Sequence, residues 1–162
     1  MNYSMKLFGL SLILVSAWLL GRAYSFYCKK RLLQLRDFVA LIAHIKKKVT
    51  LYLSTQSELL SGFVGESIAE FTDLFGSLGN IFEAFGKVRS KLCLSEKTKD
   101  TLSEFFEGFG KSYREGELER AELFLREMTE ELKNEEESTP KKIKLAYTLL
   151  FASALSLVII LL

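Results

Sequence analysis

The chain has 162 residues, of which 49% are hydrophobic and 26% charged, and its formal net charge is +2. This length leaves room for one modest domain beside any membrane segment, and two cysteines are too few for a disulfide framework. The charge is arranged in two patches, which argues against a partner selected by overall charge. Residues 29–48 carry seven basic side chains against one acidic one, whereas residues 115–137 carry ten glutamates against three basic side chains.

The first predicted element is an apolar helix over residues 1–28, including its interfacial end. The stretch 7–21 is uncharged, and it reaches spanning length if Arg22 snorkels to the interface and residues 23–28 continue the helix. A cleaved signal peptide and an amphipathic surface helix are the alternatives. The basic flank that begins at Lys29 opposes export of the middle of the chain, and the stretch has no polar face, so we predict a transmembrane helix.

The middle segment, residues 29–144, shows no strand-like alternation and is predicted to be all-helical. Its first helix carries a heptad seam that we assign to the core of its own domain in preference to an intermolecular coiled coil. The seam comprises Leu35, Phe38, Ile42, Ile45, Val49 and Tyr52. Two short aromatic-rich helices come next, separated by a turn over residues 76–80, and Ser95 is the predicted N-cap of a fourth helix. The buried residues expected in these three helices are Ile68, Phe71, Leu74, Phe75, Ile81, Phe82, Phe85, Val88, Leu102, Phe105, Phe106 and Phe109.

The last helix of the middle segment is predicted to open with a capping box formed by Ser112 and Glu115 and to end near the glutamates 135–137. Its expected buried side comprises Leu118, Leu125, Met128 and Leu132. Residues 145–162 carry no charge and form a predicted C-terminal transmembrane helix. Basic residues flank both apolar runs on the side of the middle segment, so the positive-inside rule predicts that this segment lies in the cytosol.

No catalytic or cofactor-binding motif is complete. Gly108-Phe-Gly110-Lys111-Ser112 resembles the end of a phosphate-binding loop, but the first glycine of that loop and the preceding strand are missing. The single histidine, His44, has no cysteine or acidic pair at metal-binding spacing. We therefore predict no enzymatic activity, no cofactor, no metal and no small-molecule substrate.

Charged side chains of the two patches are the predicted partner surface. The basic run lacks interleaved aromatic residues, which favours lipid headgroups or an acidic protein over nucleic acid. The predicted interface residues are Lys46, Lys47, Lys48, Glu119, Glu122, Glu130 and Glu131.

Several short motifs, taken in their order and spacing, resemble the stage III sporulation protein AB family of endospore-forming bacteria. They are Gly9 and Gly21 in the first apolar run, Arg31-Leu-Leu-Gln34-Leu35-Arg36, Gly110-Lys-Ser112-Tyr-Arg114-Glu115, Lys144-Leu145, and Leu157-Val-Ile-Ile-Leu-Leu162. The chain departs from the family pattern by Tyr113 for aspartate, Glu117 for glutamine and Thr55 for proline. It also has a basic run at 46–48 where the family has acidic residues, and Ala152, Ser153 and Ala154 where the final span usually has glycines.

The resemblance implies an antiparallel helical bundle in the cytosol, similar to the F domain of type II secretion systems, with a transmembrane helix at each end. It further implies a platform in the mother-cell membrane around the forespore, working with a secretion-type ATPase and other membrane proteins of a sporulation channel. Two other interpretations of the topology remain open. One is a generic tail-anchored scaffold, and the other is an exported helical protein retained by its C-terminal anchor.

Overall fold

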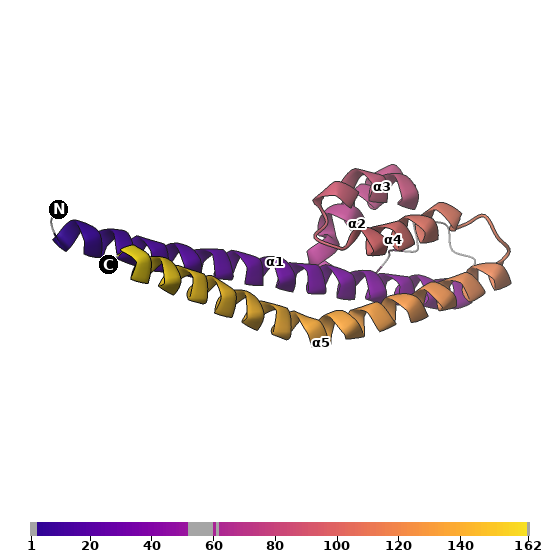
Figure 1. The fold of residues 1–162 in the computed structure, drawn as a ribbon. Helices are drawn as coiled ribbons and strands as arrows, with labels where there is room; N and C mark the ends of the chain where they lie inside the picture. Colours follow the sequence, from indigo (N-terminus) through magenta and orange to yellow (C-terminus); the bar gives the residue numbers. More distant parts are fainter. Residues whose placement is uncertain (1–2, 52–59, 61, 162) are drawn as a thin grey trace. The chain divides into compact units, whose positions relative to one another are not determined.

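The computed structural model describes residues 3–51, 60 and 62–161, and the side chains of 8–50, 60 and 62–160. Within these residues the chain is all-helical and contains no strand, which confirms the predicted fold class. The helices are α1 (Tyr3–Leu51), α2 (Ala69–Leu78), α3 (Ile81–Val88), α4 (Glu96–Gly108) and α5 (Arg114–Leu161), with short 3-10 helices η2 (Glu66–Ile68) and η3 (Arg89–Lys91) (Figure 1).

The chain divides into two compact units. Residues 1–29 and 136–162 form one unit, which we call the apolar helix pair, and residues 30–135 form the other, which we call the helical domain. The helices α1 and α5 each contribute to both units, so neither helix stops where its apolar stretch meets its charged stretch.

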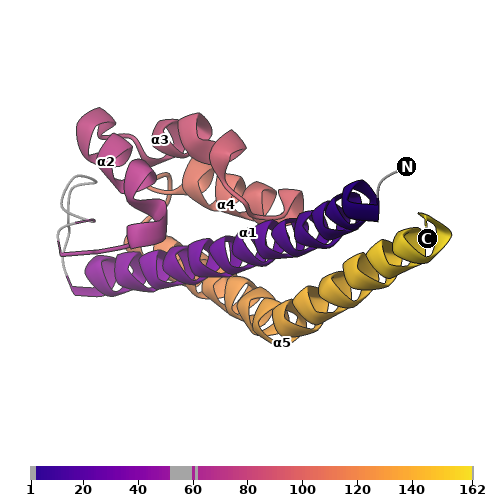
Figure 2. The ribbon, with the colours of Figure 1, turned by 90° about the vertical axis from the view of Figure 1, so that its left-hand side faces the viewer.

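The apolar helix pair consists of the first part of α1 and the last part of α5, and the beginning of α1 and the end of α5 lie at the same end of the pair (Figures 1 and 2). Both helices are long and apolar enough to cross a membrane. Only 11% and 6% of their most apolar stretches are buried, which is unlike the core helix of a soluble domain. Large side chains that a soluble protein would cover are exposed here, among them Phe8, Phe26, Leu145, Ile159 and Ile160.

Small residues bring the two helices of this pair together. Ala17, Gly21 and Ala154 are buried, although most of their apolar neighbours are not. A Cβ atom placed on Gly21 would lie 2.5 Å from Cε1 of Tyr147, so only glycine allows the aromatic ring to approach the backbone of α1. Close approach at small residues is the usual way in which helices associate within lipid.

The core of the helical domain is built around four phenylalanine rings, one from each of α1, α2, α3 and α4. Phe38 lies 5.6 Å from Phe71 and 5.9 Å from Phe85, and Phe106 lies 5.2 to 6.3 Å from these three rings. All four side chains are at most 2% exposed. The helices α2, α3 and α4 accordingly lie together on one side of this part of α1 (Figures 1 and 2). Phe105 connects α5 to the same core, because its ring lies 5.3 Å from that of Phe124.

The predicted seam of the first helix belongs to this core. Leu35, Phe38, Ile42 and Ile45 are at most 1% exposed, and Val49 packs against them while partly buried. Tyr52, the last predicted member, lies outside the described residues. Because the seam is covered by the domain itself, no apolar stripe of α1 is left for an intermolecular coiled coil through these positions.

The predicted turns and caps of the short helices are confirmed. Gly79 ends α2 with a φ of 68°, a left-handed conformation that glycine adopts without strain. The side chains of Asn80 and Ser95 accept hydrogen bonds from the backbone N–H groups of Glu83 and Thr98, at 3.1 Å in both cases. Phe82 alone among the residues expected to be buried in α2–α4 is 45% exposed.

Two predictions about the last helix are wrong. The helix does not end near the glutamates 135–137, since α5 runs without interruption to Leu161 and contains Pro140. The predicted capping box is also absent, because α5 begins at Arg114 and Glu117 takes the place expected for Glu115. Oε1 of Glu117 accepts from the backbone N–H groups of Gly110 at 3.1 Å and Ser112 at 2.9 Å. A carboxylate one turn into the helix thus folds the preceding loop back onto its first turn.

Candidate functional site

The predicted partner residues lie on α1 and α5 of the helical domain, and the structure pairs two of them with each other. Nζ of Lys46 lies 3.3 Å from Oε2 of Glu122, so one member of the basic run neutralises one member of the acidic run within the domain. Closer to the end of the domain, Arg31 donates to Glu135 at 2.6 Å. Together the two ion pairs show that α1 and α5 run antiparallel here, and that part of the predicted surface holds the domain together.

Glu131 also has a role inside the domain. Its Oε1 accepts a hydrogen bond of 2.6 Å from the hydroxyl of Thr98, which is 1% exposed, and a longer one of 3.4 Å from Ser95. Ser95 is the residue that caps α4. Glu131 therefore ties α5 to the first turn of α4, and its carboxylate is largely committed to that contact.

The other predicted residues remain on the surface. Lys47, Glu119 and Glu130 are exposed, and Glu130 has a weak ion pair of 3.9 Å with Arg126 on its own helix. Lys48 is half-buried. Of the seven predicted interface residues, those that remain exposed without an ion pair to another helix in the described part of the chain are Lys47 on α1 and Glu119 and Glu130 on α5.

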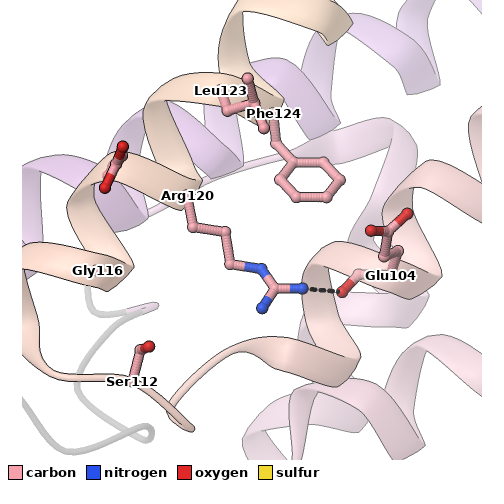
Figure 3. A pocket seen from close by; sticks show the side chains of 7 residues that line it. Glu104, Ser112, Gly116, Arg120, Leu123 and Phe124 are labelled. Carbon is pink, nitrogen blue, oxygen red and sulfur yellow. Dashed lines mark hydrogen bonds between the residues drawn. The ribbon is translucent and has the colours of Figure 1, made fainter.

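A hollow of about 470 Å³ lies where the end of α4 meets the beginning of α5 (Figure 3). It is lined by Glu104, Ser112, Gly116, Glu119, Arg120, Leu123 and Phe124. Both of its carboxylates are exposed, and Leu123 at its rim is 66% exposed.

Two arginines donate hydrogen bonds to backbone carbonyl oxygens near the ends of neighbouring helices. Arg120 donates to the carbonyl oxygen of Glu104 at 2.8 Å, in the last turn of α4, and lies 5.7 Å from the ring of Phe124 (Figure 3). Its guanidinium group fills the place where a Cβ atom of residue 108 would lie, so Gly108 leaves room for it. Arg114 donates to the carbonyl oxygens of Val49, at 3.1 Å, and of Thr50 at the end of α1. Both positive groups bind carbonyl oxygens near the C-terminal end of a helix, where a cation complements the helix dipole.

Two polar side chains of α1 accept hydrogen bonds from the segments that connect the other helices. Gln34 is 3% exposed, and its Oε1 accepts from the backbone N–H of Cys93 at 2.8 Å. Oδ2 of Asp37 accepts from the backbone N–H and the hydroxyl of Ser67, at 2.9 and 2.6 Å. Both residues could have been singled out from the sequence. Gln34 is a polar residue on an apolar helix face, and Asp37 is the single acid of the basic run.

A second hollow, of about 440 Å³, lies beside α3 and α4 and is lined by Gly86, Arg89, Ser90, Glu96 and Lys99. Lys99 donates to Glu96 at 2.9 Å, and Arg89 lies 2.6 Å from Asp100 and 3.4 Å from Glu96. The pKa of the Glu96 carboxyl is lowered, first by the hydrogen bond and charge of Lys99 and to a lesser extent by Arg89. The four charges of this cluster balance, so it serves as an ion-pair network between η3 and α4.

Among the described residues, no group of three or more histidine, cysteine or acidic side chains is placed to hold a metal ion. The ring of His44 lies 5.6 Å from that of Phe63, and its position is half-buried, as expected for a residue at the domain boundary.

Three polar motif residues, Arg31, Gln34 and Arg114, thus form contacts within the helical domain, and the comparisons agree with the motifs. The family model described as stage III sporulation protein AB matches residues 6–162, and the chain belongs to this family. No curated protein and no solved structure matched the chain. Membership in this family implies a role in sporulation, and the two candidate membrane-spanning helices fit a membrane protein.

Proposed function

We propose that this protein is a non-enzymatic platform component of a secretion-like channel complex between mother cell and forespore. In this role it couples a cytosolic secretion-type ATPase to the membrane assembly. The family match over residues 6–162 carries the proposal, because it implies a role in sporulation for the chain as a whole.

The distribution of apolar and charged residues supports the membrane part of the proposal. Exposed Lys29 and Lys30 come directly after the apolar stretch of α1, and exposed Lys141, Lys142 and Lys144 precede that of α5. Basic residues stay on the cytosolic side of a membrane, so this arrangement favours two spans with residues 30–135 in the cytosol. The platform would then lie in the mother-cell membrane around the forespore, with its helical domain within reach of a cytosolic motor.

The surface of the helical domain supports the coupling role. Several polar side chains of the family motifs have partners inside the domain, whereas the predicted partner residue Glu130 is exposed on α5. Exposed charges of this kind steer association and determine which partner fits. The coupling would therefore depend on charge contacts.

Purification of the full-length tagged chain from detergent-solubilised membranes of sporulating cells tests the proposal. At about 0.15 M salt the ATPase and the other membrane proteins of the complex should co-purify, and recovery of the ATPase should fall several-fold near 0.5 M, where exposed charges are more strongly screened. The variant Glu130→Lys should lower recovery of the ATPase at the lower salt concentration. The matched control is Asp73→Lys, which makes the same change of charge at an exposed position on α2 and should leave recovery unchanged.

Absence of the ATPase at every salt concentration would contradict the coupling role. Recovery of membrane proteins without the ATPase would favour a tail-anchored scaffold. ATPase recovery that ignores both salt and the Glu130 variant would contradict an interface made of charges.

A further inference from the structure

We propose that the helical domain binds a second copy of the same chain, side by side, with the outward face of α1 in one copy against the outward face of α5 in the other. Both faces lie within the helical domain. They are opposite in charge, complementary in size and level with each other along the two helices.

The outward face of α1 combines small side chains with positive charge. Leu33, Ala40, Ala43 and Lys47 are exposed, and their spacing of three, four and seven residues places them on one stripe of the helix. This stripe lies opposite the buried seam of Phe38, Ile42 and Ile45. Two alanines in the middle of an exposed stripe leave a shallow place that a large side chain can fill.

The outward face of α5 offers the complementary features. Leu123 is 66% exposed and stands beside exposed Glu119 at the rim of the hollow shown in Figure 3. Glu104 adds a second exposed carboxylate to this hollow, and Arg120, which also lines it, donates to the backbone of α4. The leucine can pack against the two alanines of the α1 stripe, and the carboxylates attract its lysine.

The two faces lie at the same level. Arg31 pairs with Glu135, and Lys46 pairs with Glu122, so residue numbers fall along α5 as they rise along α1. By this register Lys47 is level with Glu119, and Ala43 with Leu123, to within about one helical turn of 5.4 Å. When two copies pack side by side with their α1 helices parallel, Leu123 of one meets Ala40 and Ala43 of the other, and Glu119 meets Lys47.

A single copy cannot make these contacts with itself. Leu123 comes directly after Glu122, which lies at the α1 side of α5, and one residue further turns the side chain by about 100°, toward the hollow beside α4. A two-fold arrangement would place like charges together, basic stripe on basic stripe or acidic face on acidic face. The complementarity therefore selects a head-to-tail contact, in which each copy uses a different face.

Photo-cross-linking of the full-length chain in its native membrane tests the contact. A chain with one affinity tag and a photoreactive amino acid at position 123 is co-expressed with a chain carrying a second tag. We expect a product that contains both tags, with the cross-link mapped by mass spectrometry to residues 40–47 of the second chain. The same probe at exposed position 82 on α3 is the control and should give no such product.

Charge reversal then tests the pairing. Lys47→Glu and Glu119→Lys should each lower the yield of the two-tag product about five- to tenfold, as expected when attraction between two exposed charges becomes repulsion. A chain carrying both changes should regain the yield, since each exchanged lysine again meets a glutamate. Cross-links that join α5 to α5, a product that ignores both reversals, or no two-tag product at all would overturn the proposal. None of these outcomes depends on recovery of the ATPase, so the proposed function is tested separately.

Discussion

At the scale of single residues, a few polar side chains connect helices and loops through backbone groups. Gln34 and Arg114 of the family motifs, and Glu117, which departs from the family pattern, each bind backbone groups of a segment distant in sequence or just outside a helix. These contacts stabilise helix ends and loops whose N–H and C=O groups would otherwise lack partners.

The loop before α5 offers the clearest test at this scale. Glu117→Ala removes the acceptor of two backbone N–H groups and should lower the free energy of unfolding by about 2–4 kcal/mol, because hydrogen bonds to a charged group contribute about 1.5–3 kcal/mol each. Glu117→Gln keeps an oxygen acceptor and should cost less than about 1 kcal/mol. Thermal unfolding of the full-length chain in detergent, monitored by circular dichroism, measures both.

The matched control for this pair is Glu115→Ala. Glu115 is exposed in the first turn of α5, where a negative charge contributes about 0.3–1 kcal/mol through the helix dipole. A larger loss of stability from Glu115→Ala than from Glu117→Ala would restore the capping box predicted from the sequence and contradict the observed contact.

The wrong prediction of a capping box at Ser112 and Glu115 has a physical reason. Ser112 and Glu115 have the spacing of a capping box, but the same loop also offers the N–H groups of Gly110 and Ser112 to a carboxylate one turn further on. Gly110 has a φ of 80°, and this left-handed turn folds the loop back toward Glu117. Such a choice between neighbouring carboxylates depends on three-dimensional geometry that spacing alone does not encode.

At the scale of the elements, two neighbouring rings of α4 contact rings of all four other α-helices, since Phe106 lies against those of α1, α2 and α3 and Phe105 against Phe124 of α5. The ring of Phe106 lies within 6.3 Å of the rings of Phe38, Phe71 and Phe85, and 5.4 Å from that of Phe105. The sequence predicted that both Phe105 and Phe106 face the core but did not rank them. The structure favours Phe106 as the more costly to truncate, because it touches rings from three other helices.

Phe106→Ala should lower the free energy of unfolding by about 3–5 kcal/mol, the usual cost of truncating a buried phenylalanine. Phe105→Ala should also be destabilising, by an amount near the lower end of this range. The control is Phe82→Ala on α3, whose side chain is 45% exposed and should cost much less. Equal stability of Phe106→Ala and the unchanged chain would show that α4 does not pack as described.

The sequence predicted the five α-helices that the described residues form and most of their buried residues, since apolar periodicity records which face of a helix is covered. It did not predict that α1 and α5 each run without a break from their apolar stretch into the helical domain. The glutamates 135–137 were expected to end the last helix, yet α5 continues through them and through Pro140 to Leu161. Proline disfavours a helix interior without excluding it.

The candidate surface was less predictable than the fold. Composition identified the two charge patches but could not show that Lys46 faces Glu122, or that Glu131 binds Thr98. Which charges stay free depends on how α1 and α5 face each other and α4, and one sequence contains no direct record of that arrangement. Lys47, Glu119 and Glu130 became distinguishable from their neighbours only in the folded domain.

At the scale of the whole molecule, the proposed function depends on two apolar helices and one helical domain held on the cytosolic side of a membrane. The two candidate spans have exposed apolar surfaces, and basic residues border both of them toward the helical domain. A coupling role for the domain requires that it share a compartment with the ATPase. A self-association face on α1 and α5 requires only that copies meet side by side.

The most direct test of this topology is the position of residue 162 and of the middle of the chain relative to the membrane. A reporter pair, active only in the cytosol or only outside it, is fused after Leu162 or inserted after Gly79, in the turn between α2 and α3. We predict that the fusion after Leu162 reports an extracytoplasmic position and the insertion after Gly79 a cytosolic one. The reverse pattern, or a cytosolic signal from both positions, would contradict the two-span topology and with it the platform function.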